Sequence, residues 1–575
     1  MRRRAWWALG GSIGLLALAA SATGLRNQFA YDDVDMIQMD ARVHTLAHWW
    51  HLFAQSYWAP TWGGDGYRPL TVIGFAVQWA VGHGTPLIYH IVNVTLYVAL
   101  CVAVFWLMVG VLPRVPAWIA AALFAVHPVH VEAVGNVVGQ SELTTGLLLV
   151  LAMGIYIHGR RRGPLPAWKQ VAIVVLYGLA MLFKEHGITL VALVVLAEIT
   201  VVPDARPLRV RLVQLRPFLL GMVAMALAYL WARGVVLSGG LAGFHPYAPF
   251  QGLHLSTSDR ILTMIGLSPQ WLRLFYWPAH LATEYAPRYV TIAQGVELWE
   301  LPGLLLIVST LGLFFATLRK APLAAFGIGW VIIALSPVSN FLLPAGFLIA
   351  ERTLLFPSVG AMLLLGALIP YFHDWLASRR VAWVLGVAVA GLLVAGAWRS
   401  AMRQRVWYDN ETLMTQMVKD TPDSYRAHFM LGSWYMDTKR SPQGNAEYRK
   451  AMLLFPFDPS MAFSLAENYR VHGFCKQAIK LYGLVIELDS TSALGRPQLA
   501  ACLLKDKQYQ AARMAALDAM RHGAPVVAMH WLVLLADSAE AHPGAPVSAG
   551  PSARKTPESL QNTPPATRPR APATR

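Results

Sequence analysis

Acidic side chains follow the first long apolar segment of this 575-residue chain. Asp32 and Asp33 stand side by side in the motif Tyr31-Asp32-Asp33, shortly after an apolar run that ends at Thr23. Adjacent carboxylates near a membrane interface raise each other's proton affinity, so that one can act as a base while the other binds a substrate group. An acidic helix cap is the alternative interpretation of such a pair.

Ionisable residues also stand between later apolar segments. They form three short motifs: Tyr67-Arg68, Lys184-Glu185-His186 and Glu351-Arg352. Ionisable groups at a lipid boundary are costly, so they indicate a functional site whose members pair with one another. A purely structural network, of Lys184 with Glu185 or of Glu351 with Arg352, is the alternative.

Histidines and glutamates mark one further segment end. His127, His130 and Glu132 are close in sequence, but His130 and Glu132 are too close to share one helical face, and no third ligand has a clear spacing. This pattern does not favour a metal site. Glu142 opens the next apolar segment directly after Ser141, a residue type that caps helices.

The composition requires lipid around these residues. Hydrophobic residues make up 56 % of the chain and charged residues 14 %, with a mean hydropathy of +0.45, whereas soluble domains have roughly 45–50 % and ~25 %. A wholly soluble enzyme is therefore excluded. The net charge of +16 falls mostly in short runs between apolar segments, so it indicates membrane topology rather than a nucleic-acid partner. The three cysteines form neither a disulfide framework nor a metal motif.

Apolar runs of about 20 residues predict about eleven membrane-spanning helices. The first is interpreted as an uncleaved helix rather than a signal peptide. The predicted segments are Ala5–Thr23, Pro86–Leu112, Ala117–Val134, Leu143–His158, Trp168–Phe183, Ile188–Val202, Pro217–Val235, Leu301–Leu318, Ala321–Leu342, Thr353–Phe372 and Val381–Trp398.

Lys and Arg collect in alternate loops, which predicts the orientation because basic loops stay cytoplasmic. The opposite, non-cytoplasmic face then carries residues 25–85, 135–142, 184–187, 238–300 and 343–352, and everything after residue 398. Residues 261–281 are interrupted by Pro269 and Pro278, so they are expected at the interface and not across the membrane. The ionisable motifs therefore converge on one membrane face.

A 34-residue repeat follows the last apolar segment. Leu431, Leu465 and Leu499 keep this interval, as do Tyr448 and Tyr482. It is the tetratricopeptide period, in which paired helices stack into a solenoid. We expect a membrane domain over 1–398, a linker over 399–424, about three repeats over 425–530 and a disordered basic tail over 539–575.

Carboxylates, cations and aromatic residues at one membrane face suit transfer from a lipid-phosphate donor. The isoprenoid tail can lie between helices while cations neutralise the leaving phosphate and a carboxylate deprotonates an acceptor hydroxyl. A phosphate ester leaves readily, so no metal or other cofactor is required. The sequence has neither a Gly-rich phosphate loop nor a DxD-type motif with a soluble nucleotide fold, which argues against a cytosolic sugar-nucleotide enzyme.

The chain resembles the transmembrane-and-tetratricopeptide-repeat O-mannosyltransferases, polytopic enzymes of the GT-C class. The likeness covers residues 25–530 and rests on the order of short blocks: Tyr31-Asp32-Asp33, Tyr67-Arg68-Pro69-Leu70-Thr71, Tyr89-His90 with Asn93, Ala122 to Pro128, Lys184 to Thr189 and Ala350 to Ser358. It implies an all-α fold, in which a GT-C-like bundle of about eleven spans carries the acidic pair in an external loop over 25–85 and is followed by a small solenoid of tetratricopeptide repeats.

The resemblance also implies a reaction. A hexose, mannose in this family, moves from a polyprenyl- or dolichyl-phosphate donor to a hydroxyl acceptor on protein, by inverting single displacement. Asp32 is expected to be the base and Asp33 to orient the acceptor, while Arg352, and after it Lys184, are the first choices for the donor phosphate. Further residues assigned to the donor are Glu351, Glu185, His186, Arg68, His127 and His130, and those assigned to the acceptor or its support are Glu142, Tyr67 and His90.

The expected setting is a bacterial inner membrane with the repeats in the periplasm, although an endoplasmic-reticulum membrane has the same geometry. The expected partners are the lipid-linked donor, membrane lipid and a protein or peptide acceptor held by the repeats, with no nucleic acid. The alternatives are the same chemistry on an envelope glycan or lipid, a non-catalytic membrane scaffold, and a transporter, which would place its charges near the bilayer midplane.

Overall fold

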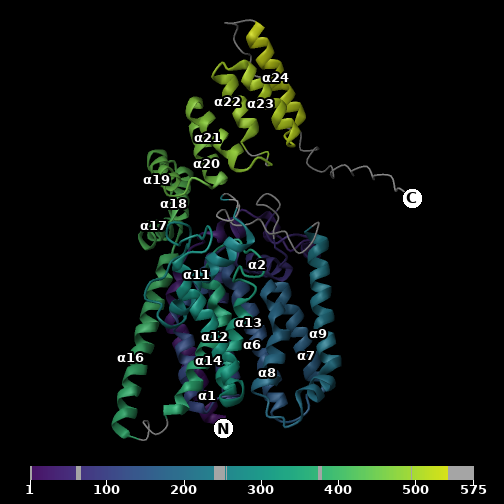
Figure 1. Cartoon of the computed structure of the whole chain (residues 1–575), viewed down its shortest axis with the longest axis vertical. Coiled ribbons are helices and arrows are strands. Elements are labelled where there is room, and N and C mark those ends of the chain that lie inside the picture. Colours follow the sequence, from purple (N-terminus) through teal and green to yellow (C-terminus); the bar gives the residue numbers. More distant parts are fainter. Residues whose placement is uncertain are drawn as a thin grey trace, which may run out of the picture. The chain divides into compact units, whose positions relative to one another are not determined.

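The computed structural model describes residues 3–59, 66–237, 253, 255–372, 378–491, 493 and 495–541. Regular structure in these residues is helical, apart from one isolated bridge between Pro287 and Val290. Contacts divide the chain into two compact units, Met1–Phe457 and Asp458–Arg575 (Figure 1). The expected all-α class is confirmed.

Seven helices of the first unit are long and apolar enough to cross a membrane. They are α1 (Arg3–Ser21), α3 (Pro86–Val109), α6 (Gln140–Arg160), α9 (Leu208–Val236), α12 (Leu301–Lys320), α14 (Leu355–Leu368) and α16 (Arg379–Gln404). Helix α14 reaches this length only together with the turns on either side of it, over Glu351–Tyr371. An eighth span results if α4 (Arg114–Ala125) is counted together with the following stretch that ends in α5 (Val131–Gly135), to which it is bent by 46°. Three apolar helices are shorter: α2 (Pro69–Gly82), α7 (Ala167–Phe183) and α13 (Pro322–Leu335).

Each of the eleven predicted segments contains a helix, but some of these helices are too short to cross alone. Helix α8 (Leu190–Thr200) has 11 residues, which is about 17 Å at the helical rise against a hydrocarbon core of ~30 Å. Helix α2 lies within the predicted external loop, and α11 (Thr257–Tyr276) overlaps the segment that was expected at the interface. By length and composition the described residues therefore hold seven or eight full spans.

The short helices α7 and α8 meet at a polar turn that the protein covers. Glu185–Thr189 forms this turn, and Lys184 and His186 are only 9 % and 7 % exposed. Irregular backbone near the membrane is tolerated where protein buries it or where it lines a cavity. The ionisable motif between the two helices is thus buried by protein.

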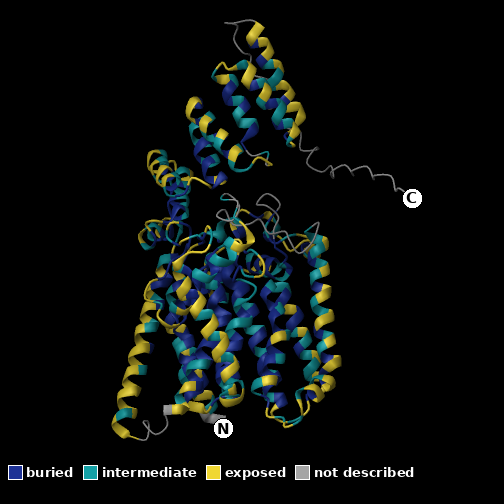
Figure 2. Cartoon of the chain, in the orientation of Figure 1, coloured by how far each residue is buried: buried dark blue, intermediate teal, exposed yellow. Residues whose placement is uncertain are grey.

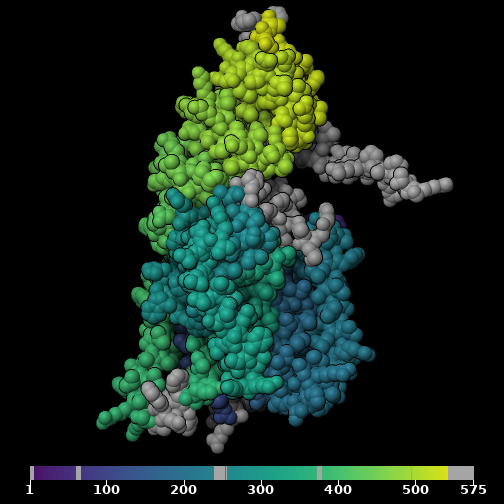
Figure 3. Space-filling view, viewed as in Figure 1, coloured from purple at the N-terminus to yellow at the C-terminus, as the bar shows by residue number. Residues whose placement is uncertain are grey.

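Helices α12 and α16 expose apolar side chains along their length. Only 6 % of the most apolar window of each is buried, and Leu305, Phe315 and Trp383 are exposed. Figure 2 draws much of α16 in the colour of exposed residues. In Figure 3, α7 to α9 in blue and α11 to α12 in teal cover much of the near face of the first unit. Exposed apolar surface of this extent requires lipid, and the chain is a multi-pass membrane protein.

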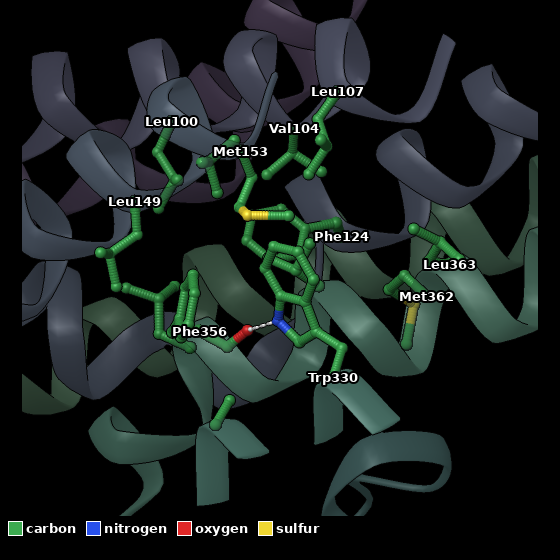
Figure 4. Close-up of a cluster of buried hydrophobic side chains, with 14 of the residues drawn as sticks. Leu100, Val104, Leu107, Phe124, Leu149, Met153, Trp330, Phe356, Met362 and Leu363 are labelled. Atoms are coloured by element: carbon green, nitrogen blue, oxygen red, sulfur yellow. Dashed lines mark hydrogen bonds between the residues drawn. The ribbon is translucent and has the colours of Figure 1, made fainter. Parts of the chain in front are cut away.

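The centre of the bundle is packed from α3, α4, α6, α13 and α14 (Figure 4). Trp330 of α13 is fully buried, and its indole N–H donates to the carbonyl of Phe356 at 3.1 Å. Gly327 and Gly360 let α13 and α14 touch, because a Cβ at Gly360 would lie 2.7 Å from the Gly327 carbonyl oxygen. This packing fixes the start of α14 and the turn Glu351–Leu354 that precedes it.

Paired helices with the predicted period follow α16. The pairs are α18 (Tyr425–Asp437) with α19 (Ser441–Leu454), α20 (Pro459–Val471) with α21 (Cys475–Leu488), and α22 (Arg496–Lys505) with α23 (Tyr509–Arg521). Helices α19, α21 and α23 each begin 34 residues after the previous one, since 475 − 441 = 34 and 509 − 475 = 34. Gly432 permits the close approach of α18 and α19, because a Cβ there would lie 2.6 Å from the Tyr448 ring.

The first helix pair, α18 with α19, is part of the first unit, together with the membrane helices, whereas the later pairs form the second unit. Ala427 and Met430 of α18 pack in one cluster with Trp407 and Ala30. In the second unit, helix α24 (Val526–Ala541) overlaps the predicted tail at residues 539–541, because Ala536 anchors this helix in a cluster with residues of the pair before it. The rest of the predicted tail, 542–575, lies outside the described residues.

Candidate active site

A cavity of about 340 Å³ lies where the loop after α1, the turn between α7 and α8, and the start of α14 meet. Its described lining includes five basic and three acidic residues: Arg68, Lys184, Arg233, Arg352, Arg426, Asp32, Glu185 and Glu284. Cavities of roughly 300–1,000 Å³ with a few convergent polar groups are typical of small-molecule sites. This one can take a charged ligand of sugar-phosphate size.

Asp32 lines this cavity. Within the described ranges its carboxylate forms no hydrogen bond and no ion pair. Burial raises the pKa of Asp32 to about 6; Arg352 opposes this rise, and Glu132, Asp35 and Glu284 add to it. A free carboxylate that is ionised at neutral pH but still basic suits proton abstraction.

Asp33 points away from the cavity into the protein. It is fully buried, and its carboxylate accepts the N–H groups of Val138 at 2.9 Å, Val137 at 3.1 Å and Ala30 at 3.5 Å. Burial raises the pKa of Asp33 to about 8, while the amides of Val138 and Val137 oppose the rise. The expectation that Asp33 orients an acceptor does not fit this position, because its oxygens already tie the loop to the start of α6.

The backbone in front of Asp32 is strained and held from outside the loop. Tyr31 has a φ of 60°, which costs a non-glycine residue about 1–2 kcal/mol. Its N–H donates to Asn410 Oδ1 at 2.7 Å, and its hydroxyl donates to Glu284 Oε2 at 3.3 Å. Arg426 Nε lies 3.0 Å from the other oxygen of Glu284. Residues after the last span therefore help to fix the turn that presents Asp32.

Arg352 lines the cavity from the turn before α14. Its Nη1 donates to Glu132 Oε1 at 2.5 Å, and its backbone N–H donates to Glu132 Oε2 at 2.9 Å. In the part of the chain that the structure describes, Nε and Nη2 of Arg352 have no hydrogen-bond partner. The guanidinium is thus oriented by one carboxylate and still has donors for an anion.

Arg68 and Arg233 share Glu185 on another wall. Arg68 Nε lies 3.0 Å from Glu185 Oε2, and Arg233 Nη1 lies 3.2 Å from Glu185 Oε1. Burial alone would raise the pKa of Glu185, but Arg68 and Arg233 outweigh it and lower that pKa to about 2. The glutamate remains ionised. Because it neutralises only one of the two arginines, this wall keeps an excess of positive charge.

Lys184 is paired with Glu142 of α6. His186 Nδ1 lies 3.4 Å from the other oxygen of Glu142. Burial lowers the pKa of Lys184, although Glu142 opposes it, and burial lowers the pKa of His186 to about 4. His186 is therefore neutral at pH 7.

Glu351 does not line the cavity. Its Oε1 accepts the N–H of Ala282 at 2.6 Å and the hydroxyl of Tyr285 at 2.8 Å, so it anchors the loop that follows α11. The alternative that Glu351 pairs with Arg352 is wrong, because residues adjacent in a helical turn do not face each other.

Lys184 and Glu185 also have separate partners: Lys184 pairs with Glu142, and Glu185 pairs with Arg68 and Arg233. The alternative of a local Lys184–Glu185 pair is therefore also wrong. In both motifs, the two neighbouring residues bind partners that lie far away in the sequence and differ from each other.

His127 and His130 lie in the core and not in the cavity. His127 Nε2 is 3.0 Å from the Phe275 carbonyl. His130 Nε2 is 2.8 Å from Ser358 Oγ, and its Nδ1 is 3.0 Å from the Tyr97 hydroxyl. Their predicted role at the donor does not fit, because the His127 ring joins the helix break after α4 to α11, and the His130 ring joins it to α3 and α14.

His90 and Tyr67 support the loop after α1 from behind. His90 is buried, with Nε2 3.4 Å from the Gln28 carbonyl, and Tyr67 donates its hydroxyl to the Phe53 carbonyl at 3.0 Å. Neither side chain lines the cavity, so contact of either with an acceptor is not favoured.

Six residues of this site were not singled out from the sequence as site residues: Tyr31, Tyr57, Glu132, Arg233, Glu284 and Arg426. Tyr31 adjoins the acidic pair and Glu132 ends the His-rich segment, so their positions in the sequence could have indicated that they belong to the site. Glu284 and Arg426 carried none, because each stands in a segment with no other indication of a site. Within the described ranges no group of three or more His, Cys, Asp or Glu side chains could hold a metal ion.

Comparison with known proteins gives consistent relatives. No family model matches the chain. It is 26 % identical over 473 residues to the human protein O-mannosyl-transferase TMTC4, with 73 % of this chain and 63 % of the relative covered. It is 26 % identical over 533 residues to Drosophila melanogaster protein O-mannosyl-transferase Tmtc3, covering 74 % and 56 %. For human protein O-mannosyl-transferase TMTC1 the identity is 25 % over 501 residues, covering 79 % and 56 %.

The resemblance inferred from the order of the sequence blocks is thereby confirmed. The chain spans about three fifths of the length of these curated relatives. Among solved structures it is similar to the archaeal oligosaccharyltransferase AglB from Archaeoglobus fulgidus in complex with an inhibitory peptide and a dolichol-phosphate. That match has a TM-score of 0.39 and 14 % identity, and covers 74 % of this chain and 59 % of the other.

Proposed function

We propose that the chain is a glycosyltransferase that moves a hexose from a polyprenyl-phosphate donor to a hydroxyl group on protein. One observation carries this proposal: a free carboxylate, Asp32, shares a cavity with a guanidinium, Arg352, that has hydrogen-bond donors to spare. A base and an anion-binding group in one cavity are the two parts that displacement of a phosphate by an alcohol needs.

Asp32 acts as the base. It takes the proton of the acceptor hydroxyl as the oxygen attacks the anomeric carbon of the donor. The bond between the anomeric carbon and the phosphate oxygen breaks in the same step, and the electron pair leaves with the polyprenyl phosphate. A single displacement of this kind inverts the configuration at the anomeric carbon.

Arg352 binds the phosphate of the donor and neutralises the charge that develops on it as it leaves. Glu132 holds Nη1 and the backbone N–H of Arg352, which leaves Nε and Nη2 to donate to the phosphate. Lys184, Arg68 and Arg233 add positive charge on the other walls, partly offset by Glu142 and Glu185. In a cavity shielded from water such interactions are stronger than in solution.

Mannose as the sugar and protein as the acceptor are supported by the names of the relatives. The positions of the basic loops support a site on the non-cytoplasmic face. The bacterial inner membrane, with the repeats in the periplasm holding the acceptor, is part of the same proposal. An envelope glycan or lipid is the competing acceptor.

Transfer from a labelled donor tests the proposal. Purified protein in detergent or nanodiscs is incubated with radiolabelled polyprenyl-phosphate mannose and a membrane protein extract. We expect label in material that protease digests, and none with Asp32→Asn protein of unchanged thermal midpoint. Label that resists protease but not glycosidase would move the acceptor to a glycan or lipid, and equal label with wild-type and Asp32→Asn protein would refute the mechanism.

A further inference from the structure

Three neutral side chains that line the cavity bury a polar atom without a partner. They are the Tyr57 hydroxyl, His186 Nε2 and Thr283 Oγ1, for which the described residues provide no hydrogen bond. Their residues are 1 %, 7 % and 8 % exposed. Buried polar groups are nearly always hydrogen-bonded, so such orphans at a cavity wall indicate a ligand.

The three atoms come from different parts of the chain. Tyr57 lies in the loop after α1, where the Arg68 guanidinium stacks on its ring at 4.6 Å. His186 lies in the turn between α7 and α8, and Thr283 lies in the loop after α11, next to Glu284. All three residues line the same cavity, so a ligand bound there can supply the missing partners.

The chemistry of these atoms selects the class of ligand. His186 is neutral at pH 7 because burial lowers its pKa to about 4. Nδ1 lies 3.4 Å from a carboxylate oxygen of Glu142, which favours the tautomer with the proton on Nδ1 and leaves Nε2 as an acceptor. The hydroxyls of Tyr57 and Thr283 can donate and accept. A phosphate oxygen would be repelled by the lone pair of Nε2. Hydroxyl groups, in contrast, can hydrogen-bond to each of the three atoms, because a hydroxyl both donates and accepts.

We propose that Tyr57, His186 and Thr283 form the subsite that binds the hydroxyl groups of the transferred sugar. The phosphate of the same donor lies at Arg352, so the two ends of the donor head group are recognised by neutral and by cationic residues respectively. This inference rests on the proposed function and adds to it the residues that select the sugar. The donor is a hexose whose ring hydroxyls must reach these three atoms.

Deoxy donors test the subsite directly. The kcat/KM is measured for polyprenyl-phosphate mannose and for its 2-, 3-, 4- and 6-deoxy analogues, with wild-type, Tyr57→Phe and Thr283→Val protein. Tyr89→Phe is the matched control, because Tyr89 is a buried tyrosine outside this cavity whose hydroxyl donates to the Phe75 carbonyl at 3.1 Å. Asp32→Asn is run in parallel to test the proposed function separately.

We expect Tyr57→Phe and Thr283→Val each to lower kcat/KM for the parent donor about 10- to 100-fold, as loss of a hydrogen bond to a bound hydroxyl does. Each variant should then show no further loss with one particular deoxy donor, the one that lacks the hydroxyl it contacts. Equal losses with the parent and with every deoxy donor would overturn the subsite, even if Asp32→Asn is inactive. Wild-type rates with Asp32→Asn would instead overturn the proposed function.

Discussion

Replacing Glu132 with Gln perturbs the orientation of Arg352. It also removes a charge that helps to raise the pKa of Asp32, so rates are compared at pH 7.5, where Asp32 is ionised in both proteins. Glu132 accepts both the guanidinium and the backbone N–H of Arg352, and Gln keeps only one oxygen for these two donors. Loss of one partner from a fully buried ion pair costs about 3–5 kcal/mol. Because the Arg352 side chain is 22 % exposed and one acceptor remains, we expect about 1–2 kcal/mol, or a 5- to 30-fold lower kcat/KM for the lipid-linked donor.

The assay is initial-rate transfer at varied donor concentration with protein of measured thermal midpoint. Glu198→Gln is the matched control. Glu198 is equally buried and pairs with Arg160 at 2.6 Å and Arg211 at 3.1 Å, but Arg160 ends α6 whereas the cavity lies at its start. We expect Glu198→Gln to lower the midpoint and leave kcat/KM within about twofold. Wild-type kcat/KM with folded Glu132→Gln protein, or an equal loss in both variants, would refute the reasoning.

Three further outcomes follow from the same site. Transfer should rise about tenfold in kcat/KM between pH 5 and pH 7, because Asp32 acts as a base only when ionised and its pKa is about 6; a flat profile would contradict this. Asp33→Asn should lower the free energy of unfolding by about 1–3 kcal/mol, because its amide group would face backbone N–H donors; an unchanged denaturation midpoint would show that these bonds contribute nothing. Asn410→Ala should lower kcat by relaxing the strained Tyr31 turn, while Gln416→Ala, which removes a bond to Asp420 on the same helix, should not; equal rates in the two variants would argue against this role.

The membrane helices could be predicted because lipid imposes a simple rule on sequence. A helix that crosses the bilayer needs a long apolar run, and each predicted segment contains a helix. Helix α2 was missed because its 14 residues are too few for that rule. The burial of the polar turn between α7 and α8 was also not evident, since the sequence does not tell which elements cover it.

For the candidate site, the sequence predicted which motifs meet but not how their side chains are paired. The Asp32, Lys184 and Arg352 motifs were expected on one membrane face, and the structure brings all three to one cavity. Their partners could not be predicted, because Glu132 and Glu142 approach from elements far away in sequence. Likewise nothing in the motif Tyr31-Asp32-Asp33 indicates which carboxylate is enclosed by backbone amides and which is free.

The single-turnover rate of Asp32→Asn protein tests the central claim most directly. It is measured with saturating donor at pH 7.5 against Asp35→Asn, an acidic residue of the same loop that does not line the cavity. If Asp32 is the base, its loss should slow transfer about 10²–10⁴-fold, while Asp35→Asn stays within about twofold of wild type. A wild-type rate with folded Asp32→Asn protein would contradict the account.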